Sequence, residues 1–151
     1  MHTQFKILKS SRAFTLKTIE GLTLEQLHTI PTGFNNHIAW NVAHLVVTQQ
    51  LLQYALAEKD LLIPDDLIKE HRKGASVIKI FNQEEWNEVL DLLMGLPDIL
   101  EEDYNAGFFK TYNKYKTSTG FVLDSLETAI MFNNYHEGLH QGIIMSLKKL
   151  V

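Results

Sequence analysis

Two histidines near the carboxyl terminus have the spacing that most clearly suggests chemistry. His136 and His140 lie four positions apart, in a segment whose apolar residues recur every three or four positions. On a helix, this spacing puts both imidazoles on one face, one turn apart. Two imidazoles in that arrangement can share a divalent metal ion. Buried neutral imidazoles need polar partners in any case, so a metal site and a hydrogen-bonded pair in the core both explain the pattern.

A third histidine interrupts a second apolar stripe. His44 falls among Trp40, Val47, Leu51 and Tyr54, which recur at helical spacing. Taken alone, one histidine on an apolar face is more often a hydrogen-bonded core residue than a ligand. If this helix faces the one that carries the pair, His44 would complete a site of three histidines. Three protein ligands leave a position open for water or substrate, as in catalytic metal sites.

Each ligand of such a site needs a partner for its outer ring nitrogen. The candidates within one turn of the three histidines are Asn41, Thr48, Asn133 and Glu137. For each of these four residues, a role as an ordinary polar residue of the helices is an equally good explanation.

Two tyrosines and four further histidines complete the residues that could do chemistry. Tyr112 and Tyr115 precede the last helix and are candidates to line a substrate entrance. The remaining histidines lie at a terminus, in loops or near expected helix ends, where solvated surface positions explain them: His2, His28, His37 and His71.

The string HEGLH at 136–140 also satisfies the zinc-protease pattern H-E-x-x-H, in which the glutamate is the general base. Only eleven residues follow His140, and none of them is a histidine, aspartate or glutamate that could be a downstream ligand. Gly138 and Gly142 each disfavour a free-standing helix by about 1 kcal/mol relative to alanine. Close approach of a neighbouring helix explains these glycines better, so we set the protease interpretation aside.

Four long segments with helical spacing must position these residues, and we expect them near 3–19, 37–58, 83–104 and 121–149. Short or moderate connections join them, including a polar loop at 105–120. Neighbouring helices joined in this way pack antiparallel. The sequence therefore predicts an all-α, antiparallel four-helix bundle, with residues 1–151 forming a single domain.

Local signals mark several helix ends. Thr23 with Gln26 is the polar pair of a capping box for one further turn, and Asn36 is the expected N-cap of the second long helix. Asn82 offers the same kind of start to the third long helix. Pro97 lies inside that helix and should kink it, because proline removes one intrahelical donor and clashes with the preceding turn.

Composition narrows the range of partners. Fourteen basic and eighteen acidic residues give a net charge of -4, without a basic cluster, which argues against nucleic-acid binding. The chain has no cysteine, so a metal site must use histidine, aspartate or glutamate. No window approaches about 18 uncharged apolar residues, and the first residues lack the apolar core of a signal peptide. We therefore expect a cytoplasmic protein of a bacterium, without a membrane partner.

Two segments resemble motifs of the DinB-like superfamily (DinB/YfiT type). The segment NHIAWNVAHLVVTQQ at 36–50 is similar to that family's N-x-x-x-W-x-x-x-H-L motif. The segment NYHEGLHQGIIMSLKKL at 134–150 resembles its closing motif, H-x-x-x-H-x-G-x-I. Both stand in the expected order, and the intervening helices are compatible with one such domain. Ile143 departs from the pattern, since this position is often glutamine in the family.

The resemblance implies an up-down-down-up bundle with one divalent metal ion, zinc, nickel, manganese or iron, between the second and fourth helices. His44 matches the family's first ligand, and His136 and His140 match the second and third. Many members are homodimers, and the characterised ones include maleylpyruvate isomerases and transferases that attach bacillithiol, mycothiol or glutathione to electrophiles. We therefore expect a metal-dependent enzyme, a low-molecular-weight-thiol S-transferase acting on small electrophiles. A metal-dependent hydrolase and a non-catalytic metal-binding or scaffold domain are the alternatives.

Overall fold

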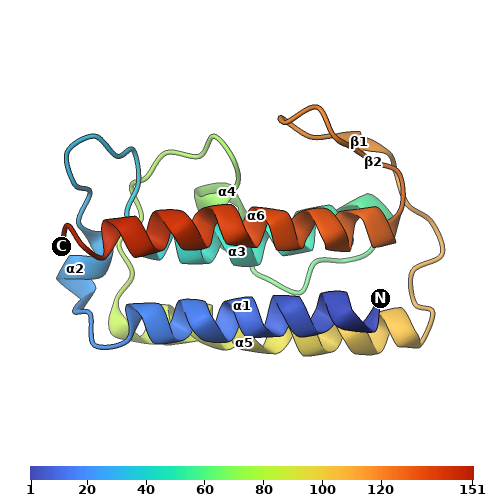
Figure 1. The fold of residues 1–151 in the computed structure, drawn as a ribbon, viewed down its shortest axis with the longest axis horizontal. Coiled ribbons are helices and arrows are strands. Elements are labelled where there is room, and N and C mark those ends of the chain that lie inside the picture. The colour runs from blue at the N-terminus through green and yellow to red at the C-terminus, as the bar shows by residue number, and fades with distance from the viewer.

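Six α-helices make up most of the chain in the computed structural model, which describes all 151 residues (Figure 1). The helices are α1 (His2–Ile19), α2 (Leu24–His28), α3 (Ile38–Gln53), α4 (Asp65–His71), α5 (Gln83–Asn105) and α6 (Leu126–Leu147). A 3₁₀ turn, η1 (Ala55–Ala57), follows α3, and β1 (Tyr115–Lys116) pairs antiparallel with β2 (Val122–Leu123). The prediction of an all-α protein is confirmed. None of the helices has both the length and the apolar character that crossing a bilayer requires.

The four long helices lie in two layers, with α1 and α6 in front of α5 and α3 in Figure 1. Helix α6 packs on α1 and α3, and α5 packs on the same two helices. The short helices α2 and α4 also pack on α3. As a result, α3 is enclosed on nearly every side, and only Thr48 and Leu51 among its residues are not buried. The main core is built around this helix and includes Leu45, Leu93 and Leu147.

Capping boxes set the starts of three helices. Thr23 and Gln26 form the expected capping box of α2, and Asn82 and Glu85 form that of α5. A third box, made by Ser125, starts α6. Helix α6 therefore begins at Leu126 rather than near residue 121 as predicted, because the preceding residues belong to the hairpin.

The second long helix also differs from its predicted bounds. Its N-cap is His37 and not Asn36, since the His37 Nδ1 accepts a hydrogen bond from the Trp40 N–H at 3.0 Å. The helix ends at Gln53 instead of near residue 58. The chain tightens into η1 there, and Glu58 adopts a left-handed conformation with φ of 57°, which ends the helical path.

Pro97 lies inside α5, and the helix remains continuous across it. A proline at this position leaves the carbonyl of Leu93, four residues earlier, without its usual intrahelical donor. Arg12 of α1 supplies that donor, because its Nη1 lies 2.9 Å from the Leu93 oxygen. The sequence element that weakens one helix is therefore compensated by a buried arginine on its neighbour.

Candidate metal centre

Three imidazoles meet between α3 and α6. His44 comes from α3, whereas His136 and His140 lie one turn apart on α6. Each offers one ring nitrogen, and these three nitrogens lie within 4.8 Å of one another. The ring centroids are 4.4 to 5.2 Å apart. No other group of three or more potential ligands is as closely gathered in the chain, so this cluster is the candidate metal site.

The side of each ring that faces the cluster is set by hydrogen bonds to the other nitrogen. The Nδ1 of His44 donates to the backbone oxygen of His71 at 2.6 Å. The Nδ1 of His140 donates to the Oδ1 of Asn41 at 2.8 Å. In a neutral imidazole, a protonated Nδ1 leaves Nε2 with its lone pair free. Both rings therefore present a ligand-competent Nε2, and such partners also fix ring orientation in metal sites.

The third ring has no such partner. The Nδ1 of His136 is buried and makes no hydrogen bond within the chain. A buried, unpaired polar atom is unfavourable unless a ligand or another group satisfies it. This orphaned nitrogen, in a cluster otherwise made of oriented imidazoles, fits a divalent metal ion.

Packing fixes His44 further. Its ring stacks on the Trp40 indole, with centroids 4.7 Å apart and an angle of 11° between the planes. Thr48 lies one turn later, and its hydroxyl is 3.2 Å from the His44 Nε2. Since the His44 Nδ1 carries the proton, the Thr48 hydroxyl donates to Nε2. Thr48 thus occupies the lone pair that a metal would take, and does not hold an outer ring nitrogen.

All three histidines are neutral near pH 7. Burial lowers the pKa of His136 to about 3, and the neighbouring His140 and His44 add to that effect. Burial, together with His44, lowers the pKa of His140 to about 4. The pKa of His44 is also lowered by burial, although its hydrogen bond to the His71 backbone opposes the shift. Neutral imidazoles are the form that binds metal.

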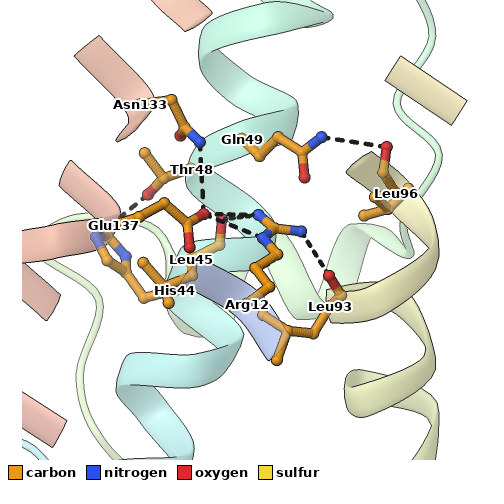
Figure 2. Close-up of polar contacts among 9 residues, drawn as sticks. All are labelled: Arg12, His44, Leu45, Thr48, Gln49, Leu93, Leu96, Asn133 and Glu137. Carbon is orange, nitrogen blue, oxygen red and sulfur yellow. Dashed lines mark hydrogen bonds and ion pairs between the residues drawn. The ribbon is translucent and has the colours of Figure 1, made fainter. Parts of the chain in front are cut away.

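Glu137 is buried, and its carboxylate points toward the Arg12 guanidinium, as Figure 2 shows. Its Oε1 accepts from the Arg12 Nε at 3.1 Å and from the Arg12 Nη2 at 2.9 Å. Asn133 donates to the same oxygen at 3.4 Å. Burial raises the pKa of Glu137, and the Arg12 guanidinium opposes that rise. Glu137 and Asn133 therefore belong to a buried ion-pair network and do not contact the three imidazoles' outer nitrogens.

Arg12 joins four helices through this network. It donates to the backbone oxygens of Leu45 at 3.3 Å and Leu93 at 2.9 Å, in addition to Glu137. Leu45 follows His44 in sequence, and Glu137 follows His136. Sequence reasoning missed Arg12, although a charged residue at helical spacing within the buried set Phe5, Leu8, Arg12, Thr15 and Ile19 was the available signal.

Two histidines outside the cluster were predicted to lie at the solvated surface, and the structure differs from that prediction. His37 and His71 are buried, not exposed at the surface. His37 caps α3, and the backbone of His71 orients His44. A backbone acceptor can belong to any residue type, so the sequence could not predict this role of His71. Burial lowers the pKa of both His37 and His71 to about 4.

A cavity of about 360 Å³ opens beside the histidines. His44 and His136 line it, together with Thr48 and residues of the hairpin that includes Tyr115. Tyr112 is not part of the lining, because its hydroxyl donates to the backbone oxygen of Leu52 at 2.9 Å. Tyr112 instead ties the segment before β1 to the end of α3.

Gly138 and Gly142 have no close neighbour within the chain. A Cβ built on either would meet no atom within 4 Å. The predicted close approach of another helix of the same chain is therefore wrong, because this side of α6 faces outward.

Three imidazoles that converge from two packed helices have the arrangement of a histidine metal centre. Comparison with family models identifies the family to which this helical protein belongs. Residues 7–144 match the model of the DinB superfamily, and the chain belongs to that superfamily. None of the curated proteins with which the chain was compared matches it.

Proposed function

We propose that the protein is a divalent-metal-dependent transferase that attaches a low-molecular-weight thiol to small electrophiles. The observation that supports this most is the set of three neutral imidazoles beside an open cavity. His44, His136 and His140 would hold the ion. A bound divalent ion would supply Lewis-acid chemistry, lowering the pKa of a thiol that binds it. Superfamily membership supports a metal-dependent protein of this kind.

The residues around the histidines have distinct tasks in this proposal. Asn41 and the backbone of His71 hold the rings of His140 and His44 in one tautomer. Thr48 loses its acceptor when the His44 Nε2 binds a metal, so its hydroxyl becomes a free donor facing the cavity. There it can donate to the sulfur or oxygen of a reacting group. Apolar side chains make up much of the remaining cavity wall.

We further propose that residues 1–151 form one domain with the up-down-down-up bundle that the family resemblance implies. The extent of the family match, residues 7–144, supports one domain. The directions of the chain in Figure 1 support the bundle, since α1 and α6 run one way and α3 and α5 the other.

A homodimer is part of the same proposal, formed through the outward face of α1 and α6. Ile7 and Phe14 of α1 are 46% and 47% exposed, and Met131 and Met145 of α6 are 45% and 43% exposed. Gly142 leaves this face open to close approach. Exposed apolar side chains that recur along two packed helices favour an association surface, and a second copy would present the same face.

Metal content and activity together test the proposed function. We expect the purified protein to contain one divalent ion per chain and to melt at a higher temperature when zinc, nickel or manganese is added. With an electrophilic acceptor, the loaded protein should consume a low-molecular-weight thiol. The absence of both metal and thermal stabilisation would contradict the proposal. Release of acid from an ester or amide without thiol consumption would replace the transferase by a hydrolase.

A further inference from the structure

The cavity beside the histidines has one charged residue in its lining, Lys73. Its ammonium takes part in none of the chain's ion pairs. Lys9 and Lys79, in contrast, are each paired with a carboxylate. An unpaired cation at the edge of a mainly apolar cavity favours a ligand with a negative charge.

The position of Lys73 is tied to the candidate metal centre. The backbone oxygen of His71, two residues earlier, accepts the hydrogen bond from the His44 Nδ1. Gly74 then adopts φ of +83°, which turns the chain directly after Lys73. The backbone N–H of Ala75 closes that turn on the Arg72 oxygen at 3.0 Å. Lys73 is therefore held by a segment that also orients a candidate ligand.

The hairpin forms another part of the lining, and Figure 1 shows its tip and the loop after α4 on the same side of the α3 and α6 pair. Thr117 donates its hydroxyl proton to the Phe121 oxygen at 2.9 Å. Thr119, 2.9 Å from the Thr117 hydroxyl, must then be the donor of that pair. Both protons are used inside the hairpin, which leaves Ser118 as the free hydroxyl at the tip.

The remaining lining is largely apolar and includes Leu51, Leu52, Leu56, Phe132 and Leu139. A lining with one lysine and no second cation matches the single charge of a carboxylate better than the double charge of a phosphate monoester. We propose that the cavity selects a small molecule with an apolar body and one carboxylate. Lys73 and Ser118 hold the carboxylate, and the apolar body packs on the leucines and Phe132. This inference rests on the proposed function, because it places the rest of the substrate beside His44 and His136.

Binding of two matched compounds tests the carboxylate preference. The probes are 4-phenylbutyrate and its uncharged amide, 4-phenylbutyramide, measured by calorimetry on the metal-loaded protein and on the same protein after chelation. We expect the carboxylate to bind about tenfold more tightly than the amide in both forms, as a charge-assisted contact predicts. The Lys73→Met variant should lose this ratio while its affinity for the amide stays unchanged. Lys69→Met removes an exposed lysine of α4 outside the cavity and should behave as the unchanged protein.

Three outcomes would overturn the inference: equal affinity for the two compounds, no binding of either, or a preference for the carboxylate that survives in Lys73→Met. The last outcome would mean that the metal or another group binds the carboxylate. The same measurements distinguish failure of this inference from failure of the proposed function. A protein that holds no metal but prefers the carboxylate through Lys73 would contradict the metal-dependent reaction and leave the cavity assignment standing.

Discussion

At the scale of single residues, hydrogen bonds to the outer ring nitrogens determine which nitrogen atoms the histidines present to a metal ion. His44 is oriented by a backbone oxygen and His140 by the side chain of Asn41. The first acceptor survives any side-chain substitution at its own position, whereas the second depends on the identity of residue 41. Asn41 is therefore the more informative position at which to test orientation.

Replacing Asn41 by alanine removes the acceptor of the His140 Nδ1–H. We expect metal affinity to fall roughly 10- to 100-fold, the usual effect of losing such a partner. Asn41→Asp keeps an acceptor oxygen and should retain most of the affinity. Both variants lose the amide donor that contacts Asn36 and the His37 backbone, so their comparison isolates the acceptor. Competition with a chromophoric chelator measures the affinity, and equal losses in the two variants would contradict this role for Asn41.

Much of the site could be predicted at this scale. The spacing of His136 and His140 indicated a shared face, and the structure brings them together with His44. For His44 the spacing was less informative, because α3 is buried on nearly every side and its apolar pattern does not single out one face. The family resemblance supplied that partner. The role of the His71 backbone had no signal, since a main-chain acceptor can belong to any residue type.

At the scale of the helices, the buried pair of Arg12 and Glu137 fixes α6 against its neighbours. The pair is fully enclosed, and Arg12 also serves the carbonyl that Pro97 leaves without a donor. A buried pair of this kind is sensitive to the loss of one partner, because the other charge is left without compensation.

A double-mutant cycle measures this coupling. Arg12→Met or Glu137→Leu alone should lower the free energy of unfolding by about 3–5 kcal/mol, as expected for breaking a buried pair. The combined variant should lose less than the sum, because no unpaired charge remains in the core. Urea unfolding of the four proteins provides the measurement. Additive losses would show that the two side chains act independently and would contradict the network.

Helix α3 carries a pH-sensitive cap. Burial lowers the pKa of His37 from 6.5 to about 4, so between these values the unfolded chain binds a proton that the folded chain does not. The free energy of unfolding should therefore decrease as the pH falls from about 6.5 to about 4, by at most about 1.4 kcal/mol per pH unit for this residue.

His37→Asn tests this assignment, because asparagine retains a capping oxygen and does not titrate. In the metal-free protein the variant should lose less stability than the unchanged chain between pH 7 and pH 5, as measured by urea unfolding. An identical pH dependence in His37→Asn would contradict the assignment.

The elements show why the rest of the fold was harder to predict. Helical periodicity and capping residues located α1, α2 and α5 well, because each signal lies within the element. The hairpin at 115–123 was predicted as loop and helix, since its two-residue strands are too short to show a period. That hairpin and the loop with Lys73 complete the cavity, so the cavity depends on the segments with the weakest sequence signal.

At the scale of the whole molecule, the outward face of α1 and α6 determines assembly in our proposal. Phe14→Glu places a charge on this face and should convert a dimer into monomers at micromolar concentration. Ile78→Glu changes a side chain that is 80% exposed but lies in the segment before α5, and should leave the dimer intact. Sedimentation equilibrium of the three proteins measures the association. A monomeric unchanged protein, or a dimer that tolerates Phe14→Glu, would contradict the proposed interface.

The central claim is that His44, His136 and His140 together hold one divalent metal ion. Crystals of the metal-loaded protein, measured on both sides of the absorption edge of the added metal, test it most directly. We predict a single anomalous peak between the three imidazoles, with the Nε2 atoms of His44 and His140 about 2.0–2.1 Å from a zinc ion. No peak at this position, or a peak bound by other residues of the chain, would contradict the claim.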